Sequence, residues 1–486
     1  MENTDLLSLN EYAQYDGLGL ADLVARKEVT PEELVATAIL AIEKVNPQLN
    51  AVLQVLSDQA IAEARGSLPQ GPFTGVPFLI KELLLHAKGI RCEMGSRLAQ
   101  GFRTHSDTEL MARFRRAGFV LTGTTQTPEF GYSPTTETVL FGPVHNPWKH
   151  GYSAGGSSGG SGASVAAGIV PVAHGNDGGG SIRIPASCNG LVGLKPSRDR
   201  IPTGPDYSDP TCGLVCEFVL SRSVRDSAAL LDVVAGADAG APGLPVPPLR
   251  PYRDEVGADP GKLRIAWTTI PASGEKCHPE CEKAVHNIVK LLEELGHTVE
   301  EKSPQYDWEE FLENIHVIWT VNNAILVEDL AKKMGRLPGP DTLESVTLAC
   351  WEDGKKFSAL DLLKSMEYGG RLSRVVGRFF EDIDIFVTPT LAKPPVPHGE
   401  MDQNRKGMTA MEWTRHIFSY IPFTPLCNTT GQPAISLPLH WSADGLPIGV
   451  QFAGHFGDEA GLFRLAAQLE KAKPWASKKP SICVAS

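Results

Sequence analysis

Gly155-Gly156-Ser157-Ser158-Gly159-Gly160-Ser161-Gly162 is the first of two glycine-dense stretches, and the second is Asn176-Asp177-Gly178-Gly179-Gly180-Ser181-Ile182-Arg183-Ile184-Pro185. Between them lie small residues that predict a helix over 163–168 and an apolar run that predicts a buried strand over 169–173. A flexible linker would not normally be followed at once by structured apolar segments. The pattern therefore predicts an α/β fold in which the two loops meet at one edge of a sheet.

The second loop has the composition of an anion site. Glycine allows the backbone to approach a ligand closely. The residues Gly178, Gly179, Gly180 and Ser181 offer four successive N–H donors. Such donors form an oxyanion hole when they point at the position where negative charge develops in acyl transfer.

Three other glycine-loop motifs do not fit these stretches. Neither loop supplies the lysine of a phosphate-binding GxxxxGK[ST] loop, and neither gives GxGxxG directly after a strand. The lipase-type GxSxG pattern matches at Ser153, Ser157 and Ser158. However, residues 147–151, which precede these matches, are not the strand that a nucleophile elbow requires.

Lys81 is the second unusual feature, because it directly follows the apolar strand predicted at 76–80. A lysine at this place either extends to solvent or is held in the core, where desolvation lowers its pKa and makes it a usable base. Taken alone, the first fate is the usual one. A serine nucleophile in the glycine loops would need a base, and this favours the second.

Together these residues resemble the amidase-signature family. Its hallmarks are the GGSSGG loop, a GGSIR segment 24 residues further on, and an isolated upstream lysine, here Lys81 in GVPFLIKE. Residues 127–131, 141–148, 387–390 and 428–434 also look like family segments. The resemblance is strongest over residues 75–200 and weaker over 240–380.

The resemblance implies a role for each site residue. Ser181 would be the nucleophile, Ser157, whose counterpart has a cis peptide bond, would relay protons, and neutral Lys81 would be the base. The amides of Gly178, Gly179, Gly180 and Ser181 would hold the oxyanion. Asp177 and Arg183 would hold the loop, and Ser158 would steady the relay. His174, beside the loop, is interpreted as a packed or hydrogen-bonded histidine, and no motif requires a metal or a cofactor.

The expected fold is the amidase-signature fold: a large mixed central sheet covered by helices on both faces, with a more helical insertion. The alternation of strands and helices by itself favours a largely parallel sheet. We expect one domain over 1–486, a catalytic core at 75–200 and a variable, mostly helical insertion at 270–380 that shapes the pocket. A long Pro/Gly-rich surface connection is expected at 235–262, and residues 17–48 are expected to be helical throughout. Thr30-Pro31-Glu32-Glu33 is a capping box, and behind it Leu34, Val35, Ala38, Ile42 and Val45 form an apolar stripe.

The composition restricts the possible partners and the compartment. With 42% hydrophobic residues, 21% charged residues and a net charge of −12, the chain is typical of a globular protein, and this charge disfavours a nucleic-acid surface. The basic run 113–116 is interpreted as a solvated helix face. There is no apolar run long enough to cross a membrane, and the polar start Met1–Asp5 argues against a signal peptide. Nine scattered cysteines, without zinc-type spacing, indicate reduced thiols in a cytoplasmic protein.

The leading hypothesis is a stand-alone hydrolase of small linear, cyclic or aryl amides, with esterase and carbamate (urethane) cleavage as side activities. The sequence resembles stand-alone amidases, including those that cleave nylon-type cyclic amides. The alternatives are a subunit of a glutamine-dependent tRNA amidotransferase and a catalytically silent scaffold. Many family members have threonine where this chain has Gly178, which predicts a wider acyl pocket. Four aromatic residues are candidate pocket or core residues: Phe130, Tyr132, Trp319 and Phe423. A homodimer would be consistent with this hypothesis.

Overall fold

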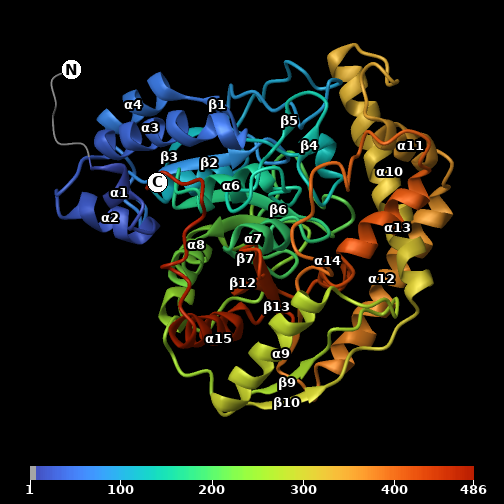
Figure 1. The fold of residues 1–486 in the computed structure, drawn as a ribbon. Coiled ribbons are helices and arrows are strands. Elements are labelled where there is room, and N and C mark those ends of the chain that lie inside the picture. Colours follow the sequence, from blue (N-terminus) through green and yellow to red (C-terminus); the bar gives the residue numbers. More distant parts are fainter. Residues whose placement is uncertain (1–6) are drawn as a thin grey trace.

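Eleven strands form one sheet, which runs from the blue β1 region to β9 and β10 at the lower edge of the view (Figure 1). The computed structural model describes residues 7–486, so the N-terminal stretch Met1–Asp5, used above to argue against a signal peptide, lies outside the described residues. In sheet order the strands are β1 (Val52–Val55), β3 (Val120–Thr125), β2 (Pro77–Lys81), β6 (Val172–Asp177), β8 (Cys216–Ser221), β7 (Val192–Lys195), β12 (Ala434–Trp441), β13 (Pro447–Gly454), β11 (Ile385–Pro389), β9 (Arg264–Trp267) and β10 (Thr298–Glu301). A separate pair consists of β4 (Glu137–Thr138) and β5 (Gly142–Pro143).

The sheet is mixed, and the expectation of a largely parallel sheet is wrong. Parallel pairing joins β2 to β3 and β6, and β9 to β10 and β11. The other six neighbouring pairs are antiparallel. The reason is that β8 lies between β6 and β7 and runs against both, although β6 and β7 are joined through a helix. β6 and β7 still run in the same direction, but a helical crossover makes two strands parallel neighbours only where no other strand inserts between them.

Helices flank the sheet. They are α1 (Leu9–Tyr12), α2 (Gly17–Ala25), α3 (Pro31–Leu49), α4 (Ser57–Arg65), α5 (Glu109–Arg116), α6 (Gly159–Ala166), α7 (Arg183–Asn189), α8 (Val224–Val234), α9 (Pro279–Glu294), α10 (Trp308–Met334), α11 (Ser345–Gly354), α12 (Ala359–Phe379), α13 (Ala410–Tyr420), α14 (Thr424–Thr430) and α15 (Glu459–Ala472). Short 3₁₀ turns lie at Glu129–Gly131 and Tyr252–Glu255. The predicted fold class, a large mixed sheet with helices on both faces and a more helical insertion, is confirmed.

The first predicted helix is in fact two. Lys27 has a φ of +61°, and this left-handed conformation ends α2. A new helix, α3, begins at Pro31 behind the predicted capping box, in which the Thr30 and Glu33 side chains each accept a hydrogen bond from the other's backbone N–H. The predicted apolar stripe of α3 is buried.

The region 270–380 supplies α9 to α12, and α10, α11 and α12 stand together with α13 at the right of the view (Figure 1). The same region also contributes β10 to the main sheet, so it is not helical throughout. The Pro/Gly-rich stretch 235–262 is irregular apart from one 3₁₀ turn, and it exposes Leu244, Val246 and Leu249. No helix within residues 7–486 has the length and apolarity needed to cross a membrane.

Candidate active site

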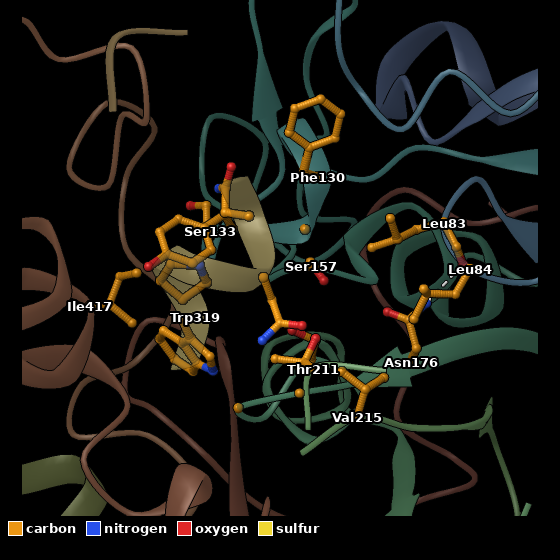
Figure 2. Close-up of a pocket in the computed structure, with 18 of the residues that line it drawn as sticks. Leu83, Leu84, Phe130, Ser133, Ser157, Asn176, Thr211, Val215, Trp319 and Ile417 are labelled. Atoms are coloured by element: carbon orange, nitrogen blue, oxygen red, sulfur yellow. Dashed lines mark hydrogen bonds between the residues drawn. The ribbon is translucent and has the colours of Figure 1, made fainter. Parts of the chain in front are cut away.

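A cavity of about 150 Å³ lies where the ends of β2 and β6 face α10 (Figure 2). Both glycine-dense loops reach it, since its lining includes Ser157 from the first loop and Gly178, Gly179 and Ser181 from the second. The loops therefore meet at one edge of the sheet, as predicted. Most of the remaining wall is apolar and consists of Leu83, Leu84, Phe130, Tyr132, Ile184, Val215, Trp319, Leu326, Ile417 and Ile421.

Lys81, the last residue of β2, is fully buried and does not extend to solvent. Its Nζ lies 2.6 Å from Ser157 Oγ and 2.6 Å from Asn176 Oδ1. Burial lowers the pKa of Lys81 well below its usual value, and the charges of Asp177 and Glu217 oppose that shift without reversing it. A lysine whose pKa is lowered in this way loses its proton more readily, and a neutral amine can accept a proton.

Asn176 is a site residue that the sequence pattern did not single out. Its Oδ1 accepts from Lys81, while its Nδ2 donates to the Leu83 carbonyl at 2.9 Å. The second bond fixes which end of the amide faces the lysine. A signal was available, because His174 and Asn176 are polar residues at alternate positions of a strand that is otherwise apolar or small up to Asp177.

The first loop places Ser157 next to the lysine. The Gly156–Ser157 peptide bond is cis, as the resemblance implied. The following residue, Ser158, ties the two loops together: its N–H donates to the Ser181 carbonyl at 3.3 Å, and its hydroxyl donates to the Asn176 carbonyl at 3.3 Å. The steadying role expected of Ser158 in the relay stays a prediction.

The second loop presents Ser181 to the cavity together with unpaired amides. Among residues 7–486, none accepts a hydrogen bond from the N–H groups of Gly178, Gly179 or Ser181. The expected role of Gly180 as an oxyanion donor is wrong, because its N–H donates to Asp177 Oδ1 at 2.7 Å and the residue does not line the cavity. An oxyanion hole here can use three of the four expected donors.

A buried ion pair holds this loop. Arg183 Nε and Nη2 donate to the two carboxylate oxygens of Asp177 at 2.9 Å each, and both side chains are fully buried. Burial alone would raise the pKa of Asp177, but the charge and hydrogen bonds of Arg183 lower it to about 2. Residues far away in the sequence complete the network, in which Arg183 also donates to the Thr424 carbonyl, Gln451 Oε1 and Asn428 Oδ1.

Comparison with known proteins decides the family. A family model described as Amidase matches residues 33–463. The chain belongs to the amidase family. It is 39% identical over 488 residues to a 6-aminohexanoate-cyclic-dimer hydrolase of Paenarthrobacter ureafaciens, with 96% of each chain covered.

Two solved structures support the same conclusion about this amidase. The fold is similar to that of a 6-aminohexanoate cyclic dimer hydrolase complexed with substrate, with a TM-score of 0.92, 36% identity and coverage of 97% of this chain and 99% of the other. It is also similar to a bacterial aryl acylamidase of the amidase signature enzymes, with a TM-score of 0.85, 25% identity and 97% of each chain covered. The protein is an amidase-type hydrolase of carbon–nitrogen bonds.

The absence of a side chain at Gly178 does not simply widen the pocket of this amidase. A Cβ atom at Gly178 would lie 2.9 Å from Val215 Cγ2, which is too close for an ordinary contact. Val215 itself lines the cavity. The space that a threonine would occupy in other family members is therefore taken by Val215.

Three of the four candidate pocket aromatics line the amidase cavity: Phe130, Tyr132 and Trp319. Phe423 does not, because it is buried in the main core and borders a different surface hollow. The indole of Trp319 packs closely against the second loop, where a Cβ at Gly179 would lie 2.7 Å from its Cζ2 atom. Glycine at position 179 is thus required for this approach.

The remaining polar candidates have hydrogen-bond or ion-pair partners within the protein. His174 is buried, with Nδ1 3.3 Å from the Lys81 amide nitrogen and Nε2 3.2 Å from Glu217 Oε1, as expected for a hydrogen-bonded histidine. The basic run 113–116 is engaged with Glu63, Asp107, Glu109 and the carbonyls of residues 234–237. All nine cysteines are free, and residues 7–486 contain no group of three or more His, Cys, Asp or Glu placed to hold a metal ion.

Replacing Arg183 with methionine is expected to lower the free energy of unfolding by about 3–5 kcal/mol, because it leaves the Asp177 carboxylate buried without its countercharge. The matched control is Arg415→Met, since Arg415 makes a two-bonded pair with Glu309 at the exposed surface and should cost at most about 1 kcal/mol. The measurement is the thermal unfolding midpoint of both variants. Equal midpoints would contradict the assigned importance of the buried pair.

Proposed function

We propose that this amidase is a serine hydrolase in which Ser181 attacks the substrate carbonyl and forms an acyl-enzyme. One observation carries the proposal. Lys81 is buried, has a lowered pKa, and its Nζ lies 2.6 Å from Ser157 Oγ. Ser157 and Ser181 line the same cavity. A buried lysine of this kind is a usable base for a hydroxyl nucleophile.

In the proposed mechanism, Ser181 Oγ forms a bond to the carbonyl carbon while its proton passes to Ser157, whose own proton passes to Lys81 Nζ. The oxyanion accepts hydrogen bonds from the amides of Gly178, Gly179 and Ser181, each worth about 3–4 kcal/mol in the transition state. Ser157 then donates a proton to the leaving nitrogen and regains one from Lys81. Water hydrolyses the acyl-enzyme through the same relay in reverse.

Supporting residues keep this geometry. We propose that Asn176 orients the Lys81 amine, that Ser158 fixes the spacing of the two loops, and that Asp177 and Arg183 hold the second loop. Asp177 also takes up the Gly180 amide, which leaves the three neighbouring amides to face the cavity. Mutual fixing of this kind keeps donors in place before charge develops.

The proposed substrates are small amides with apolar bodies, including cyclic and aryl amides. A cavity of about 150 Å³ with a mainly apolar wall supports this choice. So does the similarity to a cyclic-dimer hydrolase and to an aryl acylamidase. Esters and carbamates would react by the same acyl-enzyme route, because only the leaving group differs.

We further propose that residues 1–486 act as one domain with a catalytic core at 75–200 and a pocket-shaping insertion at 270–380, in a cytoplasmic protein. From this insertion, α10 contributes Trp319, Asn322, Asn323 and Leu326 to the cavity wall. A homodimer would be compatible with this arrangement.

The proposal is tested by following the purified chain on p-nitroanilides and p-nitrophenyl esters without ATP, tRNA or a partner protein. We expect a burst of p-nitrophenol from a rapidly acylated ester and, after acid quenching, the mass of one acyl group on the peptide that carries Ser181. Turnover only in the presence of a partner would favour the amidotransferase alternative. Absence of both turnover and labelling would favour a silent scaffold.

A further inference from the structure

Glu217 is a carboxylate that lies buried on β8. The residue is 4% exposed, and within residues 7–486 no arginine or lysine forms an ion pair with it. Its contact is with His174, whose Nε2 lies 3.2 Å from Glu217 Oε1. Two other buried carboxylates are each held by an arginine: Asp177 by Arg183 and Glu459 by Arg200. Glu217 lacks such a partner.

The hydrogen bonds of His174 indicate that this histidine is neutral. Its Nδ1 lies 3.3 Å from the Lys81 amide nitrogen, and a backbone N–H can only donate. Nδ1 therefore accepts, the ring proton is on Nε2, and Nε2 donates to Glu217 Oε1. Burial lowers the pKa of His174 against the opposing effect of Glu217, which favours the same uncharged form. The histidine thus gives Glu217 a hydrogen bond but no positive charge.

The register of the sheet places Glu217 beside the proposed base. β8 runs next to β6, and Glu217 lies directly opposite Asn176. Residues directly opposite each other in antiparallel strands have their side chains on the same face of the sheet. Since Asn176 Oδ1 accepts from Lys81 Nζ at 2.6 Å, the Glu217 side chain and the Lys81 amine are both neighbours of Asn176. A carboxylate at this place acts on the charge of the amine without a direct contact.

Other charged and titratable groups surround this pair. Burial lowers the pKa of Lys81, and the charges of Asp177 and then Glu217 oppose that shift. The two carboxylates differ, because both oxygens of Asp177 are bound by Arg183, whose positive charge offsets theirs. Glu217 itself also faces the thiol of Cys92 and the phenol of Tyr207. Neither of these can become a cation, whereas the Lys81 amine gains positive charge when the relay delivers a proton.

The proposed mechanism thus creates a positive charge in a buried place. Lys81 changes there from an amine to an ammonium, and burial makes such a charge costly. A fixed carboxylate nearby lowers that cost, and it needs no reorganisation because it is in place before the proton arrives. In Ser-His-Asp enzymes a buried aspartate stabilises the imidazolium that forms during catalysis in the same way.

We propose that Glu217, held by neutral His174, stabilises the ammonium that forms on Lys81 during the relay and so sets the strength of this base. Glu217 acts through Lys81 and is a positioning residue that does not touch the substrate. Folding does not require its charge, since glutamine has the same shape and an uncompensated buried carboxylate destabilises the folded state. The inference rests on the proposed serine amidase function and adds a residue to its machinery.

The test is Glu217→Gln, which removes the charge and keeps the shape of the side chain. We expect the maximal kcat on p-nitroanilides to fall by about 5- to 50-fold, with KM changed less than about twofold. The acid limb of the kcat profile should move to lower pH, because loss of the carboxylate lowers the pKa of Lys81 further. Tm should not fall. A merely structural role would instead lower Tm and leave the pH of half-maximal kcat unchanged.

The titration of Lys81 is also measured without turnover. In protein whose lysines carry carbon-13 at Cε, the Lys81 resonance is identified by its absence in Lys81→Met. Its titration midpoint should lie at lower pH in Glu217→Gln than in the wild type. This measurement does not depend on whether the enzyme cleaves the chosen substrates.

Two further variants serve as controls. Glu217→Asp keeps the negative charge, so it should keep the pH of half-maximal kcat and lose less activity than Glu217→Gln. Asp353→Asn breaks another histidine–carboxylate pair, in which Asp353 Oδ2 lies 2.9 Å from His316 Nε2 outside the cavity. It should change neither kcat nor the pH profile.

The outcomes separate the inference from the proposed function. An unmoved acid limb and lysine resonance in Glu217→Gln, or equal effects of Glu217→Asp and Glu217→Gln, overturn the inference alone. So does a Glu217→Gln variant that does not fold, since the fold would then require the charge. Absence of wild-type turnover on every substrate overturns the proposed function, and the lysine titration still decides whether Glu217 acts on Lys81.

Discussion

Ser181→Ala is expected to lower kcat/KM by about 10⁴- to 10⁶-fold on p-nitroanilides, aliphatic amides, aryl carbamates and p-nitrophenyl esters alike. The reason is that all these substrates would use the same nucleophile, and only the leaving group would differ. The Oγ atom of Ser181 makes no hydrogen bond to another residue of the described chain, so its removal should leave Tm within about 1 °C of the wild type.

The measurement is steady-state turnover of both proteins on the full panel, with circular dichroism to compare the folds. Some activity above the uncatalysed rate should persist, because the amides of Gly178, Gly179 and Ser181 remain in place. A folded variant with wild-type activity on amides would refute the assignment of Ser181. Loss confined to esters would indicate a different nucleophile for amides.

Lys81→Met is expected to lower kcat by about 10³- to 10⁴-fold near neutral pH, because the relay then lacks its proton acceptor. The wild-type kcat should rise with pH as Lys81 loses its proton, and the variant should lack this rise. Activity is measured as a pH profile of kcat for both proteins. A variant that kept the wild-type profile would exclude Lys81 as the base.

The same substitution is expected to raise stability. The pKa of Lys81 is lowered by burial in the folded protein, whereas an unfolded lysine titrates near about 10.4. Between the pKa of Lys81 in the folded protein and about 10.4, the unfolded chain binds a proton that the folded chain does not. The wild-type free energy of unfolding therefore falls as the pH decreases from about 10.4. Methionine has no such penalty. The Tm advantage of Lys81→Met should thus be largest at low pH and shrink towards pH 10, and an advantage independent of pH would contradict a neutral buried lysine.

A variant that is inactive and more stable would have a clear meaning. Lys81 and Asn323 are both polar groups that the fold holds at a cost in stability, one with a lowered pKa and one without partners. Such costs are expected where a site is built for a ligand rather than for folding.

The sequence by itself determined the features that depend on local backbone and neighbouring residues. Glycine at 178 and 179 frees the backbone, the apolar run before Lys81 makes a buried strand, and the capping box starts α3. Each of these is decided within a few residues, by backbone freedom or by hydrogen bonds to positions three apart. The meeting of the two loops at one sheet edge followed from the helix and strand between them.

Only the tertiary structure decided what depends on residues distant in the chain. The insertion of β8 between β6 and β7 made the sheet mixed, and Asn428 and Gln451 complete a network around Arg183 from 245 and 268 residues away. Likewise, Val215 fills the space beside Gly178, and the cavity face of α10 leaves Asn323 unpaired. Side-chain partners of this kind are chosen by the packing of the whole sheet, since local periodicity fixes which face a residue occupies and not what lies opposite it.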